Sequence, residues 1–536
     1  MKRILSLFLA AIMLLSIAPL SLAEEEATWW KKYDEPVTVE MTKVIYSDTA
    51  DKYAKLGESV EDNRWSRLFK EELNVDITYK FVASAGDAYD TKKQMMLATG
   101  KIPDVFTVGL SDMFDLQDSG QIWDMTEIWD KYLSPTSKAI LTADGGGAYD
   151  SCLIDGKLYG IPFLTSVYDT WRYLSIRRDW MENLGLEEPK SIDDLLKIME
   201  AFVTQDPDGN GIDDTYALYC DKDMFTQLEG FFWMFGAYPN AFIEKDGRLV
   251  YGALQPEAKE ALRVLNMMYE KGWIDPEFTV KTFNQAKEAV TNGKVGCIMG
   301  YHWMPFDVNG PMHEFFPEVE WDYYLWPSAE EGVPATVMSQ SSLDGVLVVN
   351  KKFKHPELAA YIINLYCELL YSENPTYEYW YWDTATGELT YNIGPFEILD
   401  QGINLNPYRD MKKVWAGEMT VEELNPYSRY YYDMVNTDWA WNTMWGPGEH
   451  TAGVVLDYLV NHPEYIIQNA YVGMPTETQQ DRGSVLGEIR KTAYIQMITG
   501  YIDIDEGFDK MVKDYMKAGG QDIEDEINEW YQANKK

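Results

Sequence analysis

Residues 171–219 predict a strand, two helices and a polar loop in direct succession, and this order constrains the fold of the 536-residue chain more than any other feature. Tyr173–Ile176 is apolar and favours a strand. Arg178–Leu184 predicts a short helix that ends at a glycine, because glycine takes the positive φ of a helix stop. Ile192–Thr204 predicts a second helix, with Ser191 as its N-cap and aspartates in its first turn. Strands that lead into helices in this way are typical of an α/β fold.

The polar loop after the second helix has the residue types and the spacing of a calcium-binding loop. Oxygen-bearing side chains recur at alternate positions beside a glycine, and a hard cation such as Ca²⁺ takes six to eight oxygen ligands. Ala217 stands where a standard EF-hand loop has a glutamate, and no neighbouring histidine suggests catalysis, so we expect a structural role. The alternative is a solvated turn without a metal. The candidate ligands are the side chains of Asp206, Asp208, Asn210 and Asp214 and the backbone carbonyl of Ile212.

The first 23 residues have the pattern of a signal peptide. Lys2 and Arg3 precede the apolar run Ile4–Ile17, and Ser21-Leu22-Ala23 is a small-x-small cleavage site. No later stretch approaches about 20 uninterrupted apolar residues, the length that a membrane-spanning helix needs. We therefore expect an exported protein, either periplasmic or at the cell surface. No cysteine lies near the cleavage site, so a lipid anchor of the bacterial lipoprotein type is not expected.

The net charge of −41 argues against several classes of partner. A strongly acidic surface repels nucleic acids and anionic lipids. The net charge is only weak evidence against a polyanionic ligand, because a local basic pocket can override the average charge of the surface. The pairing of any disulfides stays open, but buried thiols are expected because Cys297 and Cys367 lie in apolar stretches and no C-x-x-C pair occurs. The cysteines are Cys152, Cys220, Cys297 and Cys367.

An alternation of strands and helices occupies the first part of the mature chain. This order predicts a parallel sheet covered by helices, in which ligands bind beyond the carboxyl ends of the strands. Ser111 and Asp112 follow the third strand and are therefore candidate ligand contacts; the alternative is an ordinary loop with a helix cap at Ser111. The predicted strands are Val37–Ile45, Asp76–Phe81 and Pro103–Val108, and the predicted helices are Asn63–Leu73 and Asp87–Thr99. Further along the chain, Asp383–Tyr391 predicts a hairpin with Gly387 in its turn, and Glu488–Ile498 predicts a helix.

Several segments carry a recognisable combined pattern: IRRDWMENLGLEEPKSIDDLLKIMEAF with the DPDGNG loop, MLATGKIPDVF, DGKLYGIPF, GKVGCIMGYHW and the segment from Pro475 onwards. Together they resemble the extracellular solute-binding proteins of ABC importers (family 1), including the type that binds alginate oligosaccharides. The resemblance implies an α/β fold of the type II periplasmic-binding-protein class, with two discontinuous lobes, a hinge and an interlobe cleft. It also implies calcium in the loop, although the family has Asp-Glu where this chain has Asp214-Thr215.

The resemblance divides the mature chain into two lobes, each formed by two stretches of sequence. The chain is expected to cross between the lobes near Phe163–Asp169 and again at Tyr301–Trp303. The expected limits are 1–23 for the signal peptide, 24–36 for a flexible leader, 37–165 and 304–372 for lobe one, and 166–303 and 373–536 for lobe two.

Aromatic residues make up 14% of the chain, which fits a carbohydrate site because sugar rings stack on Trp and Tyr through their apolar faces. The alternative for any single ring is a place in the core. Rings near the crossovers and in WAWNTMWGPG are the candidates, and an extended segment there would put Trp439 and Trp441 on the same side. The candidate ligand contacts among the aromatic residues are Tyr168, Trp171, Tyr301, Trp303, Trp439, Trp441 and Trp445.

We expect an extracytoplasmic binding protein, not an enzyme, that captures an oligosaccharide in the interlobe cleft and delivers it to the permease subunits of an ABC transporter. A monomer with structural Ca²⁺ and no nucleic-acid partner is expected. Arg172 and Arg177 are the basic candidates for an acidic sugar, and the alternative for Arg177 is a structural role at a helix start. The alternatives are a secreted glycoside hydrolase, which needs two suitably placed carboxylates, and a binding protein for a peptide or another non-sugar solute.

Overall fold

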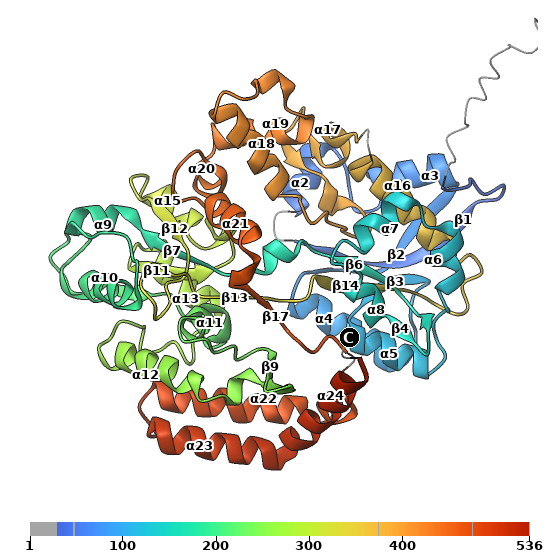
Figure 1. The fold of residues 1–536 in the computed structure, drawn as a ribbon. Helices are drawn as coiled ribbons and strands as arrows, with labels where there is room; N and C mark the ends of the chain where they lie inside the picture. Colours follow the sequence, from blue (N-terminus) through green and yellow to red (C-terminus); the bar gives the residue numbers. More distant parts are fainter. Residues whose placement is uncertain (1–28, 47–48, 373–374, 474, 535–536) are drawn as a thin grey trace, which may run out of the picture.

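The computed structural model of the chain describes residues 29–46, 49–372, 375–473 and 475–534, which form two lobes side by side (Figure 1). The expected signal peptide lies outside these residues. Each lobe has its own β-strands with helices packed against them, which confirms the predicted two-lobe α/β fold. No helix in the described ranges is long and apolar enough to cross a membrane.

The first lobe contains a two-stranded sheet and a three-stranded sheet, built from strands of the beginning of the chain and one strand that returns from far along it. β1 (Val37–Ile45) and β2 (Val75–Ser84) pair in parallel, as the strand–helix–strand order predicts. β14 (Leu343–Val349) lies between β3 (Val105–Val108) and β6 (Ile161–Leu164) and is antiparallel to both. The two-stranded sheet is therefore parallel, whereas both strand pairings of the three-stranded sheet are antiparallel. The hairpin β4 (Leu153–Ile154) and β5 (Lys157–Leu158) precedes β6.

Local signals in the sequence set the limits of the helices on this sheet. α4 (Asp87–Thr99) has its predicted limits. α3 (Arg64–Leu73) starts one residue later than predicted, because the side chain of Asn63 caps it by accepting from the backbone N–H of Trp65 and Ser66. In Figure 1, α3, α7 and α16 lie on one side of the sheet and α4, α5 and α8 on the other. The remaining helices here are α2 (Thr49–Leu56), α5 (Leu110–Asp118), α6 (Thr126–Tyr132), α7 (Pro135–Leu141), α8 (Gly147–Ser151) and α16 (Leu358–Tyr371).

The second sheet has the strand order β12-β7-β11-β8. β7 (Tyr173–Arg177) is antiparallel to both of its neighbours, β11 (Val295–Gly300) and β12 (Trp321–Tyr324), whereas β8 (Tyr216–Leu218) runs parallel to β11. All residues of β7, β11 and β12 are buried, so this sheet forms the centre of the second lobe.

The helices that follow β7 have the predicted limits. They are α9 (Arg178–Leu184), which ends at Gly185 with φ 63°, and α10 (Ile192–Thr204). The Oγ of Ser191 accepts from the backbone N–H of Asp194 at 3.2 Å, which confirms the predicted N-cap. Other elements of this lobe are α11 (Phe225–Trp233), β9 (Phe242–Lys245), β10 (Arg248–Tyr251), α12 (Glu257–Glu270), α13 (Phe283–Thr291), α14 (Met304–Asp307), α15 (Gly310–Phe315) and α21 (Ala452–Asn461).

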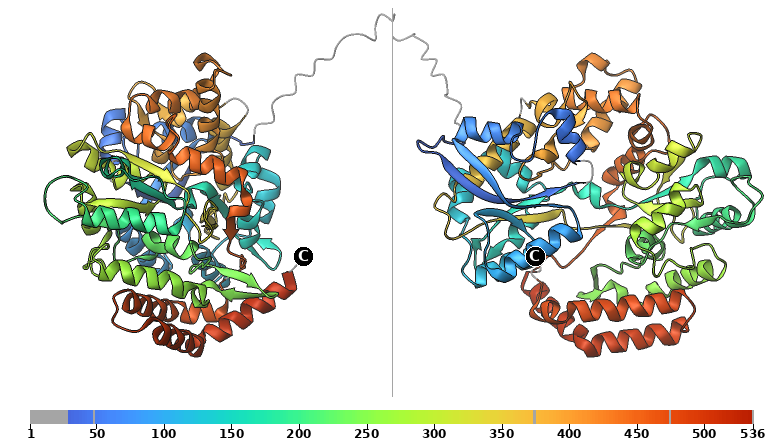
Figure 2. Two further views of the ribbon diagram at one scale, coloured as in Figure 1. Left: turned by 60° about the vertical axis from the view of Figure 1, so that its left-hand side comes forward. Right: turned by 180° about the vertical axis from the view of Figure 1, so that it is seen from behind.

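Three helices close the chain along one side of the second lobe, where Figure 2 shows them in red. They are α22 (Glu477–Ile498), α23 (Ile504–Tyr515) and α24 (Gln521–Asn534), and a single π turn at Met516–Gly520 separates the last two. We predicted α22 only from Glu488. The helix starts earlier because Thr476 and Gln479 form a capping box.

The chain returns to the first lobe later than expected. β12 pairs with β7 of the second sheet, so the expected transfer to lobe one at residue 304 does not match the strand pairing. The crossing instead uses β13 (Val337–Ser339), which leads into β14 and pairs in parallel with β17 (Ile466–Gln468). The first passage of the chain from one lobe to the other lies between β6 and β7 and contains a short 3₁₀ turn at Val167–Thr170.

Part of the segment that was expected in lobe two packs on lobe one instead. The guanidinium of Arg64 forms an ion pair with Asp383 at 3.0 Å, and the indole N–H of Trp65 donates to the Thr390 carbonyl at 3.2 Å. The predicted hairpin around Gly387 is present. Elements of this segment and of the chain that follows it are α17 (Tyr377–Trp380), β15 (Trp382–Asp383), β16 (Glu388–Leu389), α18 (Leu405–Trp415), α19 (Pro426–Val435) and α20 (Trp439–Trp445).

The described part of the leader is held against the first lobe, contrary to the expected flexible segment. The backbone N–H of Tyr33 donates to the Leu73 carbonyl at 2.9 Å, and its hydroxyl donates to Glu357 at 2.8 Å. Asn364 of α16 donates to the Trp29 carbonyl at 2.6 Å. Aromatic rings and backbone partners therefore anchor residues 29–36.

All four cysteines are buried as free thiols, as predicted. Burial raises the pKa of the Cys152 thiol to about 12, and the same cause raises the pKa of the Cys367 thiol to about 12. These thiols therefore stay protonated and act as small apolar core groups.

Candidate functional site

A cavity of about 740 Å³ lies where the two lobes meet. The first lobe contributes Leu110 at the start of α5 together with α8, and the second lobe contributes Asn240 and Asn469. The crossing segments complete the wall, including Tyr168, Ser339, Ser342 and Gln401. Because both lobes line this cavity, a bound solute would touch both lobes at once.

The first-lobe wall is positioned by helices that start at the cavity. α5 begins directly after β3, as expected for a segment beyond the carboxyl end of a strand. α8 is held by Asp144, whose two carboxylate oxygens accept from the backbone N–H groups of Gly146 at 2.9 Å and Ala148 at 2.7 Å. Gly146 has φ 91°, a conformation that favours glycine.

Gln401 holds the first crossing segment in place through hydrogen bonds. Its side-chain oxygen accepts from the backbone N–H of Val167 at 2.6 Å, and its amide donates to the Thr165 carbonyl at 2.8 Å. The Ser166 hydroxyl donates to the carbonyl of Gln401 at 2.8 Å. Sequence reasoning missed Gln401, because its contacts join parts of the chain more than 200 residues apart.

Two serines of the other crossing segment belong to the cavity lining and carry buried hydroxyls. The side chains of Ser339 and Ser342 are 2% and 3% exposed, and neither Oγ has a hydrogen-bond partner among the described residues. A buried polar group without a partner costs roughly 1–3 kcal/mol. These serines therefore leave two hydrogen-bonding groups unpaired beside the cavity.

Of the predicted aromatic contacts, Tyr168 is the one that lines the cavity. Its ring packs edge-on against Trp171, with ring centroids 5.2 Å apart. Trp171 is 3% exposed, so it supports the Tyr168 ring from behind. Tyr301 and Trp303 stack on each other at 4.7 Å and lie outside the lining of this cavity.

The segment with three tryptophans is helical, so the extended alternation considered from the sequence is wrong. Residues two apart on a helix face different sides: Trp439 stacks on His313 at 4.3 Å, whereas Trp441 packs on Tyr431 at 4.7 Å. Trp445 is 1% exposed. Asp438, the N-cap whose side chain accepts from the Trp441 N–H, was the sequence signal for this helix.

Ser111 and Asp112 lie in the first turn of α5 and do not line the cavity, although the preceding Leu110 does. The helix cap considered for Ser111 is at Gly109 instead. The expected basic contacts are also occupied elsewhere. Arg177 forms a two-point ion pair with Asp179 at 2.7 and 2.6 Å, the structural role considered as its alternative.

A buried polar cluster stands beside the first crossing and was not predicted. Asp169 accepts from the side-chain amide of Asn404 at 2.8 Å, and the Tyr431 hydroxyl donates to the oxygen of that amide at 2.6 Å. The Nε2 of His302 lies 3.8 Å from Asp169. Burial raises the pKa of Asp169 to about 7 and lowers the pKa of His302 to about 3.

The predicted metal loop is compact and held by its own hydrogen bonds. The carboxylate of Asp206 accepts from the backbone N–H groups of Asn210 at 3.1 Å and Gly211 at 2.9 Å. The ammonium of Lys294 contacts Asp208 at 3.1 Å and Asp214 at 2.8 Å. Among the described residues, no group of three or more His, Cys, Asp or Glu side chains is gathered as a metal site.

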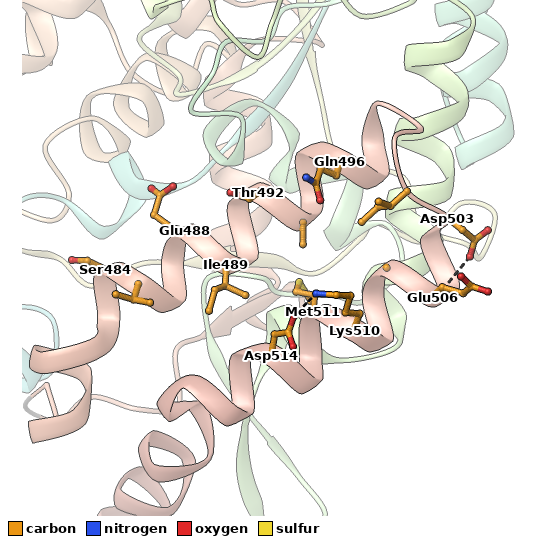
Figure 3. A pocket seen from close by; sticks show the side chains of 14 residues that line it. Ser484, Glu488, Ile489, Thr492, Gln496, Asp503, Glu506, Lys510, Met511 and Asp514 are labelled. Carbon is orange, nitrogen blue, oxygen red and sulfur yellow. Dashed lines mark hydrogen bonds and ion pairs between the residues drawn. The ribbon is translucent and has the colours of Figure 1, made fainter.

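A larger cavity of about 900 Å³ lies elsewhere, between α22 and α23 (Figure 3). Apolar side chains such as Ile489 and Met511 line it, and Lys510 pairs with Asp514 at 2.5 Å along its side. Both helices belong to the second lobe. A ligand there would touch a single lobe, so the smaller interlobe cavity is the better candidate site.

Comparison with known proteins places this architecture in a family. The model of the bacterial extracellular solute-binding protein family matches residues 46–365. The chain is 25% identical over 448 residues to the polygalacturonan/rhamnogalacturonan-binding protein YtcQ of Bacillus subtilis (strain 168), which covers 82% of each chain. It is 31% identical over 211 residues, 35% of this chain and 37% of the other, to the fructooligosaccharide ABC transporter substrate-binding protein FusA of Streptococcus pneumoniae serotype 4 (strain ATCC BAA-334 / TIGR4).

A solved structure confirms the fold. The alginate-binding protein AlgQ2 without calcium ion superimposes with a TM-score of 0.62 at 17% identity, covering 95% of this chain and 100% of the other. The family resemblance read from the sequence is thus confirmed by an independent match of sequence and of fold. The chain belongs to the bacterial extracellular solute-binding protein family.

Proposed function

We propose that the chain captures an oligosaccharide in the interlobe cavity and delivers it to an ABC transporter. The observation that carries this proposal is that both lobes and both crossing segments line one cavity of about 740 Å³. Its polar groups are mainly amides and hydroxyls, which suit sugar hydroxyls, and Tyr168 offers a ring for stacking. Relatives named for binding polygalacturonan and fructooligosaccharides support the same class of ligand.

Binding would act by closure of the lobes about the crossing segments. β13 and β17 form a narrow two-strand connection, and the 3₁₀ turn at Val167–Thr170 forms the other. A ligand that contacts both walls stabilises the closed arrangement because it binds that state better. The permease subunits of the transporter would then select the closed protein, which acts as a monomer outside the cytoplasmic membrane.

The contacts expected from the sequence enter this proposal in different ways. Tyr168 would stack on the sugar and Trp171 would hold it in place. Ser111, Asp112, Tyr301 and Trp303 would meet the ligand only after closure. Trp439, Trp441 and Trp445 would serve mainly to pack α20.

The lining favours binding over glycoside hydrolysis. Hydrolysis of a glycosidic bond needs two carboxylates on either side of it. The described lining contains one acidic side chain, Asp144, and both of its oxygens are engaged at the start of α8. Release of reducing ends with sustained turnover by the mature protein would contradict a binding role.

A thermal-shift screen of the mature protein against neutral and uronic-acid oligosaccharides tests the proposal. A ligand at about 100 times its dissociation constant should stabilise by about 2.7 kcal/mol. Tyr168→Ala should then weaken binding about tenfold, since loss of a stacked ring costs about 1 kcal/mol or more. Tyr501→Ala is the matched control, because that ring is 79% exposed and outside the cavity. A panel without any shift would remove the sugar assignment, and peptides would be tested next.

We also propose a structural Ca²⁺ in the Asp206–Asp214 loop. The donor set of carboxylate and amide oxygens fits a hard cation, and the Ile212 carbonyl is part of the same turn. Lys294 would have to leave Asp208 and Asp214 for the ion to bind. EDTA should lower the melting temperature and Ca²⁺ should restore it, and Lys294→Met should strengthen the Ca²⁺ response. No change with either reagent, in the wild type and in the variant, would leave the loop as a plain turn.

A further inference from the structure

The described lining of the interlobe cavity carries no positive charge, although the chain has 46 lysines and arginines. The described residues that line it include no lysine and no arginine, and the one charged side chain is the acidic Asp144. The other polar side chains carry amides, as in Asn240 and Gln340, or hydroxyls, as in Ser339 and Ser342. The wall therefore offers hydrogen bonds but no positive charge.

The arginines that stand near this wall make contacts within the protein, although the Nε of each has no hydrogen-bond partner among the described residues. Arg172 is 5% exposed, donates to the Thr170 carbonyl at 2.6 Å and lies 3.7 Å above the ring of Tyr301. Arg490 donates to the side-chain oxygen of Asn240 at 3.1 Å and to the Pro239 carbonyl at 2.5 Å. Both guanidinium groups lie behind the lining and outside it.

A buried carboxyl group lies behind the same wall. Glu229 is 1% exposed and accepts from the amide of Asn240 at 3.0 Å. Burial raises the pKa of Glu229, and the charges of Arg172 and Arg490 offset this effect only in part. What separates the two arginines from a ligand is their position, because neither side chain belongs to the described cavity lining.

This arrangement discriminates between classes of sugar. Recognition of a carboxylate normally uses arginine or lysine, because an ionised group that leaves water must be paired. A uronic acid in this cavity would lose its hydration without gaining a cationic partner, and it would approach Asp144 and a protein of net charge −41. Sugar hydroxyls, in contrast, can both donate to and accept from amides and serine hydroxyls.

We propose that the ligand of the interlobe cavity is an uncharged oligosaccharide and not a polyuronate. The inference rests on the proposed function. One relative is named for binding fructooligosaccharides, which are neutral, and another for binding polygalacturonan, which is acidic. The inference assigns this chain a ligand of the neutral class. Specificity arises chiefly because the cavity penalises a carboxylate and less because it strengthens a particular hydroxyl contact.

Calorimetric titration of the mature protein tests this inference with matched probes. The probes are neutral trisaccharides of fructose and of galactose, trigalacturonic acid, and the methyl ester of trigalacturonic acid, which keeps the shape and removes the charge. A neutral probe should bind at least about 100-fold more tightly than trigalacturonic acid, which corresponds to about 2.7 kcal/mol. Its affinity should be unchanged between low salt and about 0.5 M salt, because no ion pair forms.

The possible results are distinguishable. Tighter binding of trigalacturonic acid than of its ester, weakened by salt, would overturn the inference and leave the sugar-binding function standing. Absence of binding by every saccharide would overturn the sugar-binding function and the inference with it. Binding of a neutral probe with rejection of the acid supports both.

An introduced positive charge tests whether acidic sugars are rejected in the interlobe cavity. Gln340 is exposed on the lining, so Gln340→Arg places a guanidinium there without disturbing the core. The variant should strengthen binding of trigalacturonic acid about tenfold, or about 1.4 kcal/mol. Gln496→Arg, in the cavity between α22 and α23, adds the same charge elsewhere and should have no effect. Equal responses of the two variants would contradict recognition in the interlobe cavity.

Discussion

The carboxyl group of Asp169 gives a quantitative test of how the lobes meet. Its side chain is 18% exposed, and the single hydrogen bond that it accepts from Asn404 does not compensate for the loss of water. Burial therefore raises the pKa of Asp169 to about 7. In the unfolded chain an aspartate has a pKa near 3.9, so the folded state holds this proton more tightly.

The sign of the effect on stability follows from that difference. The contribution of Asp169 is fully present below about pH 4 and is lost as the pH rises through about 7. Between about pH 5 and about pH 8 the free energy of unfolding should fall by about 2–3 kcal/mol on account of this group. His302 acts in the opposite direction, because its pKa is lowered to about 3 and its folded form resists protonation.

Asp169→Asn isolates the carboxyl group from the histidine. The new amide keeps an oxygen that can accept from Asn404, and it removes the titration. Relative to the wild type, the variant should therefore be more stable at about pH 8 than at about pH 5 by about 2–3 kcal/mol.

Urea unfolding of both proteins at the two pH values measures this change. Asp118→Asn, at an exposed position at the end of α5, is the control and should give no pH-dependent difference from the wild type. Identical pH dependence of the wild type and Asp169→Asn would refute the assigned burial of Asp169 at the lobe junction.

Three further substitutions probe other contacts. Gly230→Ala should lower the free energy of unfolding by about 1–3 kcal/mol, measured in urea, because a Cβ there would lie 2.4 Å from the indole of Trp326. Arg177→Met should cost about 3 kcal/mol, because it leaves the carboxylate of Asp179 without its partner, and adding Asp179→Asn should recover part of that loss. Gln401→Ala removes two hydrogen bonds from the first crossing and should speed hydrogen exchange at the amides of this segment, with little change in α22.

Local patterns predicted the individual elements well. Caps and helix stops are encoded within a few residues, so Ser191 and Gly185 mark the limits of α10 and α9 correctly. The start of α22 was missed because its first half is polar, although Thr476 and Gln479 carried the capping signal. The helical state of residues 439–445 was missed for a similar reason, since Asp438 was not recognised as an N-cap.

The site depended on contacts that no local pattern contains. Asp169, His302 and Asn404 come from three distant parts of the chain and meet only after both lobes have formed. The return to the first sheet through β13 was also not predicted, because a short strand that pairs with residues 466–468 has no local signature. The family resemblance predicted the two lobes. Which aromatic ring lines the cavity depends on tertiary packing, and the structure places Tyr168 there.

A crystal structure of the mature protein with the neutral oligosaccharide that gives the largest thermal shift would show where the sugar binds. We expect sugar density in the interlobe cavity, with a ring on Tyr168 and hydroxyls within hydrogen-bond distance of polar side chains of the lining. Density in the groove between α22 and α23, with the interlobe cavity free of sugar, would contradict this expectation.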